Sequence, residues 1–261
     1  MISKIRKLQN TDKPLVCLTA YSYPVAKILD EYCDVILVGD SVAMTIYGAD
    51  KMQEVSLDMM INHGRAVTRG AKKPLIVVDL PFGTYEKSLD QALLNAKRLL
   101  KETGCDAIKI ECDEDMVVVA KYLVENDIPL MGHIGLLPQK TQSIADCRYQ
   151  GRDEKSANKI VQTAKKLEEV GVFSLVIEGV PADLADKIVH LVNIPTIGIG
   201  ASASCSGQIL VIDDILGLNT EFKPKFVKQY GNVTDDVKRA VLSFKKEVES
   251  RNFPAKENLF S

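Results

Sequence analysis

The chain has 261 residues, of which 46% are hydrophobic and 26% charged, and its formal net charge is −2. This size and composition are typical of a soluble globular protein that buries most of its apolar surface. The sequence contains no cluster of lysine and arginine with interleaved aromatic residues, which argues against nucleic-acid binding. Its longest apolar runs fall far below the roughly 18 residues of a membrane span, and its first residues lack an apolar signal segment. We therefore expect a cytoplasmic protein.

The six cysteines are spread over the whole chain, and none of them forms a Cys-x-x-Cys pair. This spacing favours reduced thiols in a cytosolic protein over a disulfide framework or a structural zinc site. A catalytic thiol at Cys112 or Cys205 is an alternative, but a small core or loop residue is the commoner role of such a cysteine.

Short runs rich in β-branched residues alternate with longer segments of helical periodicity. The runs are almost continuously apolar, as expected of parallel strands that are covered on both faces. This alternation predicts a parallel α/β fold, and a chain of about 250 residues suits a single (β/α)8 TIM barrel. We expect one barrel domain over residues 1–261, with residues 253–261 as a C-terminal tail. The predicted strands are Leu15–Thr19, Val35–Val38, Leu75–Val78, Ala107–Ile110, Pro129–Gly132, Phe173–Ile177, Thr196–Ile199 and Ile209–Ile212.

The segments between the strands carry helix signals. Ser88 and Gln91 form a capping-box pattern, and the acids at 113–115 stand where the dipole of a following helix favours negative charge. Apolar residues recur at helical spacing in the segment after Ser88 and in another near the C-terminus. These residues are Leu89, Leu93, Ala96 and Leu100, and then Val237, Val241, Phe244 and Val248.

A weak internal repeat supports the barrel. Residues 100–111, LKETGCDAIKIE, resemble residues 167–178, LEEVGVFSLVIE. In each copy a glycine, Gly104 or Gly171, is placed to end a helix in the left-handed conformation. A strand and then a glutamate follow, so the repeated unit is a helix, a glycine stop, a strand and an acid.

Polar residues stand at the C-terminal ends of five of the predicted strands. In a barrel these ends converge on one mouth, where active sites form. Burying so many charges costs on the order of several kcal/mol each unless they are paired or bind a cation. A single acid after a strand is most often a cap or loop residue, but five such ends in order favour a functional site. The residues are Asp40, Asp79, Lys109 with Glu111, His133 and Glu178.

Three of these acids indicate a metal. Asp40, Asp79 and Glu111 come from successive strands, and hard oxygen ligands from neighbouring strand ends suit Mg²⁺. Zinc would prefer histidine or cysteine, and the chain has only three histidines.

The pattern leaves two chemistries open. In the first, a divalent ion holds a 2-oxo acid while a carboxylate removes the proton next to its carbonyl group, and the ion acts as a Lewis acid. In the second, Lys109 forms a Schiff base with the substrate. The acids around Lys109 would keep it charged, so the metal route fits better.

At these residues the chain resembles the ketopantoate hydroxymethyltransferase family, also called 3-methyl-2-oxobutanoate hydroxymethyltransferases. The matching stretches follow the family's order from about residue 15 to 230 and are highly specific together. They are Val38–Ser41, Arg65–Gly70, Asp79–Glu86, Ile108–Glu111, Gly132–Gln139, Ile177–Pro181, Ile194–Gly200 and Gly207–Asp213.

The resemblance implies a barrel of the phosphoenolpyruvate/pyruvate type. It implies transfer of a one-carbon unit from the co-substrate 5,10-methylenetetrahydrofolate to 3-methyl-2-oxobutanoate. The product would be 2-dehydropantoate, in the pathway to pantothenate and coenzyme A. It also implies Mg²⁺ as cofactor and assembly as a homodecamer of two pentameric rings.

The resemblance also implies roles for individual residues. Asp40 and Asp79 match the family's direct metal ligands, and Glu111 matches its third metal-site acid, directly or through water. Glu178 matches the catalytic base. The substrate-binding groups are matched by Asp40, Ser41, Asp79 and Lys109, with His133 as a histidine of the active-site mouth.

The chain departs from the family's pattern outside these residues. Cys112 and Asp113 stand where glycines are usual, and Ser206 and Asp213 replace a usual acid and histidine. The stretch 48–50 lacks another common histidine. These departures bear on the folate side of the mouth and on subunit contacts.

Two rival functions stay open beside this one. A related barrel lyase of oxo acids would commonly need a cysteine in a Lys-Lys-Cys-Gly-His stretch, which the sequence lacks. A barrel kept as a non-catalytic scaffold would have no reason to bury the five charged residues of the metal, lysine and base positions.

Overall fold

The computed structural model describes residues 4, 13–141, 148–219 and 224–260. The chain divides into two compact units, residues 1–211 and 212–261. The expectation of one domain over residues 1–261, with a tail at 253–261, stays a prediction. Among the described residues, no helix is both long and apolar enough to cross a membrane.

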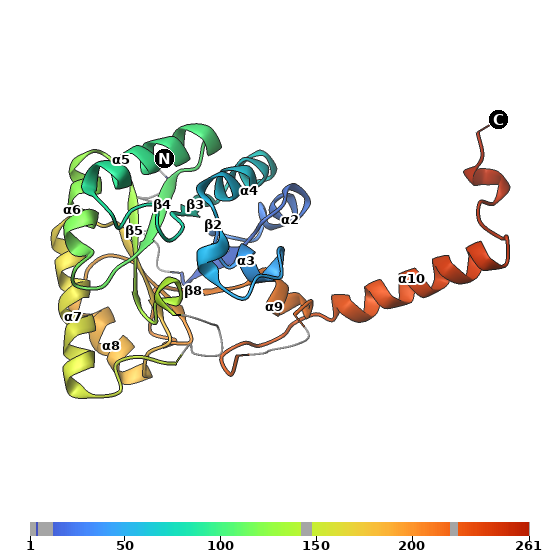
Figure 1. The fold of residues 1–261 in the computed structure, drawn as a ribbon. Coiled ribbons are helices and arrows are strands. Elements are labelled where there is room, and N and C mark those ends of the chain that lie inside the picture. Colours follow the sequence, from blue (N-terminus) through green and yellow to red (C-terminus); the bar gives the residue numbers. More distant parts are fainter. Residues whose placement is uncertain (1–3, 5–12, 142–147, 220–223, 261) are drawn as a thin grey trace. The chain divides into compact units, whose positions relative to one another are not determined.

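The first unit is a closed barrel of eight parallel strands, which confirms the predicted (β/α)8 fold. Each strand pairs with its neighbours in chain order, and β1 closes the barrel against β8. Figure 1 shows helices outside the strands. The strands are β1 (Leu15–Thr19), β2 (Val35–Val38), β3 (Leu75–Asp79), β4 (Ala107–Glu111), β5 (Leu130–Gly135), β6 (Ser174–Glu178), β7 (Thr196–Ile199) and β8 (Gly207–Leu210).

The prediction of the last strand at Ile209–Ile212 was wrong by two residues. The strand begins at Gly207, which pairs with both Leu15 and Ile197. A Cβ atom at Gly207 would lie 2.6 Å from the Leu15 Cβ atom, so a glycine is needed for the strands to approach here. Ile212 instead begins a short helix, α9 (Ile212–Leu216).

Helices follow strands β1 to β6 of the first unit. Two short 3₁₀ helices, η1 (Met52–Glu54) and η2 (Pro138–Lys140), lie in loops at the carboxyl ends of strands. The helices of this unit are α2 (Tyr23–Leu29), α3 (Val42–Thr45), α4 (Leu57–Gly70), α5 (Leu89–Thr103), α6 (Val117–Glu125), α7 (Glu154–Glu169) and α8 (Ala182–Leu191).

The local signals around α5 are largely confirmed. The Ser88 hydroxyl accepts the backbone N–H of Gln91 at 3.1 Å, but the Gln91 side chain returns to the N–H of Lys87 rather than to that of Ser88. Gly104 ends the helix with φ +72°, in the left-handed conformation. The fully buried face is Ala92, Ala96 and Leu99, and the predicted Leu89, Leu93 and Leu100 flank it half-buried.

The second unit contains α9, α10 (Val233–Glu249) and η4 (Lys256–Asn258). The helix predicted from Val237, Val241, Phe244 and Val248 is confirmed as α10, which buries none of its side chains. Asn232 caps it by accepting the backbone N–H of Asp235, and the rings of Phe244 and Phe253 meet edge to face.

Candidate active site

The charged residues of the barrel mouth continue the inward-facing rows of the apolar interior. The interior cluster includes one residue each from four successive strands, namely Val77, Ala107, Met131 and Val176. Side chains two apart on a strand point to the same side. Two residues further toward the carboxyl ends stand Asp79, Lys109, His133 and Glu178. The barrel geometry therefore aims these four side chains at the same mouth.

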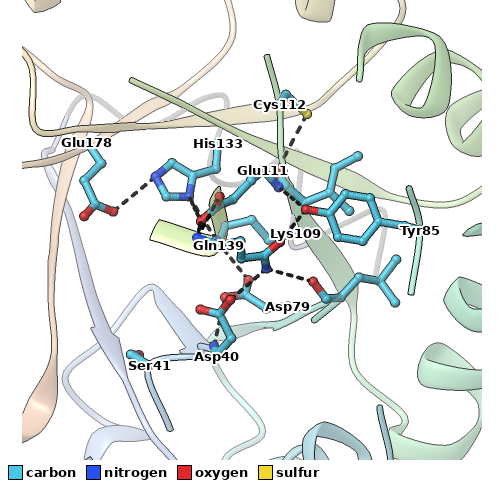
Figure 2. Close-up of polar contacts among 12 residues, drawn as sticks. Asp40, Ser41, Asp79, Tyr85, Lys109, Glu111, Cys112, His133, Gln139 and Glu178 are labelled. Atoms are coloured by element: carbon cyan, nitrogen blue, oxygen red, sulfur yellow. Dashed lines mark hydrogen bonds and ion pairs between the residues drawn. The ribbon is translucent and has the colours of Figure 1, made fainter. Parts of the chain in front are cut away.

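Asp40, Asp79 and Lys109 form a deeply buried group (Figure 2). Asp79 and Lys109 are register partners on β3 and β4, and Lys109 Nζ lies 3.1 Å from Asp79 Oδ1. The backbone N–H of Asp40 donates to Asp79 Oδ2 at 3.1 Å. Burial raises the pKa of Asp79 to about 7; the Lys109 ammonium acts in the lowering direction and the Asp40 carboxylate in the raising direction. The two acids expected to share a cation are therefore neighbours.

Lys109 keeps its charge although only 4% of it is exposed. Burial acts to lower its pKa, but three surrounding carboxylates outweigh burial and raise the pKa above its ordinary value. These carboxylates belong to Asp79, Asp40 and Glu111. An ammonium that holds its proton is a poor nucleophile, so the Schiff-base chemistry is disfavoured. Lys109 is instead suited to attract an anion.

Glu111 ends β4 and is 2% exposed. Both of its carboxylate oxygens accept the backbone N–H of Gln139, at 3.2 and 3.1 Å. Burial, followed by the charge of Asp40, raises the pKa of Glu111 well above its usual value. Among the described residues, the mouth thus gathers more carboxylates than the Lys109 ammonium neutralises.

His133 links Lys109 to Glu178 (Figure 2). Its Nδ1 lies 3.3 Å from Lys109 Nζ, and its Nε2 lies 3.1 Å from Glu178 Oε2. An ammonium only donates, so Nδ1 accepts and the ring proton is on Nε2, facing the Glu178 carboxylate. Burial and the charge of Lys109 lower the pKa of His133, which favours this neutral form. In this neutral form His133 turns its ring N–H toward the Glu178 carboxylate, 3.1 Å away, without a well-aligned hydrogen bond.

Gly135 fixes where Glu178 ends its strand. Its φ is +94°, and a Cβ atom there would lie 2.3 Å from the Glu178 carbonyl oxygen. The backbone N–H of Leu136 donates to the same oxygen at 2.8 Å. Only glycine allows β5 and β6 to meet this closely beside the Glu178 side chain.

Ser41 stands beside the charged cluster, next to Asp40. Its hydroxyl lies 2.7 Å from that of Tyr21, which is buried after β1. A Cβ atom at Gly39 would lie 2.8 Å from Ser41 Oγ, so glycine leaves the space that the hydroxyl needs. The sequence did not indicate Tyr21, because a single tyrosine after a strand carries no pattern of its own.

Two further residues of the site were missed from the sequence, Gln139 and Tyr85. Gln139 is 1% exposed, and its Nε2 donates to Asp40 Oδ2 at 2.7 Å. The Tyr85 hydroxyl donates to Gln139 Oε1 at 2.5 Å. Both lie within stretches that carry the family resemblance, but the contacts join residues far apart in the chain and leave no local spacing to read.

The donor set fits a hard divalent cation. Asp40, Asp79 and Glu111 offer carboxylate oxygens, which Mg²⁺ prefers, and only the ammonium of Lys109 opposes their charge within the cluster. Among the described residues, no three side chains of histidine, cysteine, aspartate or glutamate are gathered as a ready ligand set. Two acids together with water or substrate oxygens are therefore the ligand set that this arrangement favours.

The cysteines do not form a reactive centre in the described part of the chain. Cys112 and Cys205 are buried free thiols, as are Cys17, Cys33 and Cys105. Burial raises the pKa of Cys112 to about 12. The interpretation of these residues as fillers agrees with this burial, whereas Cys147 lies outside the described residues.

A closed (β/α)8 barrel with charged side chains gathered at the carboxyl ends of its strands defines a barrel enzyme. The model of the ketopantoate hydroxymethyltransferase family matches residues 1–256. A 3-methyl-2-oxobutanoate hydroxymethyltransferase of Rhizobium etli is 49% identical over 248 residues, covering 95% of this chain and 91% of that protein. One of Cereibacter sphaeroides is 47% identical, covering 95% and 89%. The chain belongs to the ketopantoate hydroxymethyltransferase family of enzymes.

Solved structures of lower identity share the fold. A phosphoenolpyruvate phosphomutase of Streptomyces platensis has a TM-score of 0.64 at 10% identity, with 99% of this chain and 91% of that chain covered. A 2,3-dimethylmalate lyase has a TM-score of 0.62 at 15% identity, with 100% and 88% covered. These similarities show that the barrel fold is shared.

Proposed function

We propose that the protein transfers a hydroxymethyl group from 5,10-methylenetetrahydrofolate to 3-methyl-2-oxobutanoate, giving 2-dehydropantoate. We further propose that it uses Mg²⁺ and that Glu178 is the base. The observation that carries this proposal is the buried cluster of Asp40, Asp79 and Lys109, joined through His133 to the carboxylate of Glu178. Membership of the family supports the transfer reaction. The buried cluster supports the use of a cation and of a carboxylate base.

Asp40 and Asp79 would hold the cation, with Glu111 near it directly or through water. When bound, Mg²⁺ supplies Lewis-acid stabilisation of negative charge on the keto oxygen of the substrate. The raised pKa of Asp79 and of Glu111 reflects carboxylates buried without full compensation. A cation would provide that compensation.

Substrate binding would use the groups beside these acids. The Lys109 ammonium and the Ser41 hydroxyl would hold the substrate carboxylate, since an ammonium and a hydroxyl both donate hydrogen bonds to an anion. Tyr21, through its bond to Ser41 Oγ, limits the directions in which that hydroxyl can point. Asp40, Asp79 and His133 would complete the walls of the oxo-acid site.

Glu178 would take the proton from the branched carbon of the oxo acid. Its Oε2 lies 3.1 Å from His133 Nε2, so the imidazole ring stands beside the carboxylate before substrate arrives. Its side chain is 16% exposed, against 2% for Glu111 and Asp79, so it faces the open part of the mouth. The carbanion formed by this proton transfer would attack the methylene carbon carried by the folate. Water would then replace the folate nitrogen on that carbon, which gives the hydroxymethyl group and releases tetrahydrofolate.

A direct assay tests the reaction. The protein is mixed with 3-methyl-2-oxobutanoate, methylenetetrahydrofolate and Mg²⁺, and 2-dehydropantoate is measured with and without a chelator. We expect product only when all three are present and the chelator is absent. Cleavage of isocitrate or methylisocitrate instead would favour the lyase alternative. Binding of Mg²⁺ and oxo acid without any turnover would favour a scaffold.

We propose a cytoplasmic location, supported by the free thiols of the five described cysteines. The homodecamer implied by the family resemblance is likewise a proposal, which sedimentation of the purified protein would test.

A further inference from the structure

Gln139 is a buried amide that reaches several groups of the mouth at once. It belongs to η2, the turn after β5. Its Nε2 donates to Asp40 Oδ2 at 2.7 Å and to the Leu80 carbonyl oxygen at 3.1 Å. Its Oε1 accepts the Tyr85 hydroxyl at 2.5 Å. Both amide hydrogens and the amide oxygen are therefore engaged.

These partners allow only one orientation of the amide. Were the amide turned over, Oε1 would face the Asp40 carboxylate and the Leu80 carbonyl, which are both acceptors. Tyr85 favours the same orientation of the Gln139 amide. Its hydroxyl oxygen accepts the backbone N–H of Glu111 at 3.3 Å, which leaves the hydroxyl hydrogen for Gln139.

The same residue holds a second acid through its backbone. The Gln139 N–H donates to both carboxylate oxygens of Glu111, while its side chain holds Asp40. One turn thus contacts acids from the ends of β2 and β4. Mutation of groups that orient metal ligands without touching the metal typically lowers metal affinity by about 10- to 100-fold.

We infer that Gln139, held by Tyr85, is a positioning residue that aims the carboxylates of Asp40 and Glu111 at the cation. This inference rests on the cation site of the proposed function and extends it to residues outside the ligand set. It separates two roles of one residue, since its side chain acts on Asp40 and its backbone on Glu111. A side-chain substitution therefore tests the Asp40 role alone.

The test measures binding of Mn²⁺ alone to the purified full chain, by electron paramagnetic resonance of the free ion. Gln139→Met keeps the length of the side chain and the backbone N–H but removes both amide donors. We expect its Mn²⁺ dissociation constant to rise about 10- to 100-fold. Tyr85→Phe removes only the hydroxyl and should raise the constant by about tenfold or less. Melting temperatures show that each variant is folded.

The double variant tests whether Tyr85 acts through Gln139. If it does, the loss of Mn²⁺ affinity in Gln139→Met with Tyr85→Phe is smaller than the product of the two single losses. A loss equal to that product would mean that the two side chains act independently, and the role assigned to Tyr85 would be wrong.

Gln53→Met is the matched control. Gln53 Nε2 donates to the carbonyl oxygens of Gln139 and Thr141, at 2.6 and 2.9 Å, so it supports the same turn without touching a carboxylate. We expect its Mn²⁺ affinity to stay within about twofold of the wild type, well below the loss typical of ligand-orienting groups. An equal loss in Gln53→Met and Gln139→Met would assign the effect to the turn and overturn the inference.

The outcomes separate this inference from the proposed reaction. If the wild type binds Mn²⁺ and makes dehydropantoate but Gln139→Met binds Mn²⁺ equally well, the inference is wrong and the reaction stands. If Gln139→Met loses affinity but the wild type makes no product, the reaction is wrong and the positioning role stands. If the wild type binds no Mn²⁺, the cation site and its positioning are both wrong.

Discussion

The two halves of the barrel mouth differ in how deeply their charged side chains are buried. Strands β2 to β5 contribute acids and a lysine that are at most 7% exposed and are linked by ion pairs and hydrogen bonds. Strands β6 to β8 contribute Glu178, whose side chain is 16% exposed, and a loop of small neutral residues over 200–206. Gln208 Nε2 on β8 donates to the Ser202 carbonyl oxygen, and the Ser202 hydroxyl donates to the Asp186 carboxylate on α8.

This difference in burial suits the two halves to different tasks, the first half to binding and the second half to the reaction. Buried charges that are fixed by one another reorganise little, which suits a site that keeps an ion and an anionic substrate in one geometry. A partly exposed carboxylate beside a neutral loop suits a step in which a proton leaves and a second substrate enters. We therefore expect damage to the first half to affect stability and binding together, and damage to Glu178 to affect rate alone.

The largest effect is expected from Lys109→Met. The change leaves Asp79 buried without its ammonium, and removal of one partner of a buried pair typically costs about 3–5 kcal/mol of stability. We expect the unfolding free energy to fall by about this amount and the oxo-acid dissociation constant to rise. Urea unfolding and substrate titration measure the two. Lys166→Met, which breaks an exposed pair with Glu114, is the control and should cost about 1 kcal/mol or less.

The loss of stability in Lys109→Met is expected to depend on pH, and the pKa of Asp79 gives the direction of this dependence. The raised pKa of Asp79 means that the folded metal-free protein binds more protons than the unfolded chain, so this contribution to stability is lost as pH rises through about 7. Without Lys109 that pKa rises further. We therefore expect the variant to be more strongly destabilised, relative to the wild type, at pH 8 than at pH 5. An equal or smaller difference at pH 8 would contradict the pairing of these two residues.

The second-largest effect is expected on the rate of proton removal from the oxo acid. In Glu178→Gln the proposed base is lost, while the groups of the first half that are proposed to bind the oxo acid are untouched. Exchange of the branched-carbon hydrogen with deuterium should slow by about 10²- to 10⁴-fold, the usual contribution of a positioned base. Oxo-acid affinity should change by less than about threefold, as for a variant that loses an interaction made only in the transition state. Unchanged exchange would remove the assignment of the base, and Glu125→Gln on the surface of α6 serves as the control.

A smaller effect is expected at the edge of the first half. Tyr21→Phe removes the hydroxyl that meets Ser41 Oγ, a bond worth about 0.5–1.5 kcal/mol. We expect the KM for the oxo acid to rise about 2- to 12-fold, which is that energy converted to a ratio, with kcat nearly constant. Steady-state kinetics give both values. A fall in kcat at constant KM would place Tyr21 in the chemical step instead, and Tyr32→Phe on the surface controls for loss of a hydroxyl.

Much of the first half could be predicted from sequence because its signals are local. Strands such as Val35–Val38 are continuous apolar runs, and a period of two carries Lys109 and Glu111 to the same face. The last strand was misplaced because its start, Gly207, is chosen by contact with Leu15 rather than by β propensity.

The contacts that complete the site could not be predicted in this way. Gln139 and Asp40 are 99 residues apart, and Tyr85 and Gln139 are 54 apart. Such pairs are created by the closure of the barrel and leave no periodic trace in either segment. The tautomer of His133 is likewise set by the ammonium on one side of its ring and the carboxylate on the other.

The smallest effect is expected from substitution of two cysteines, one in each half of the mouth. Cys112 follows β4 and Cys205 precedes β8, and burial raises the pKa of both, that of Cys112 to about 12. A nucleophilic cysteine needs its thiolate, which for Cys112 becomes abundant only as pH approaches that value. Cys112→Ala and Cys205→Ala should therefore keep kcat and KM within about twofold, at roughly 1 kcal/mol of stability each. Steady-state kinetics measure kcat and KM of both variants. A loss beyond tenfold in either variant would place a nucleophile in that half, and carboxylates alone would no longer explain how the halves differ.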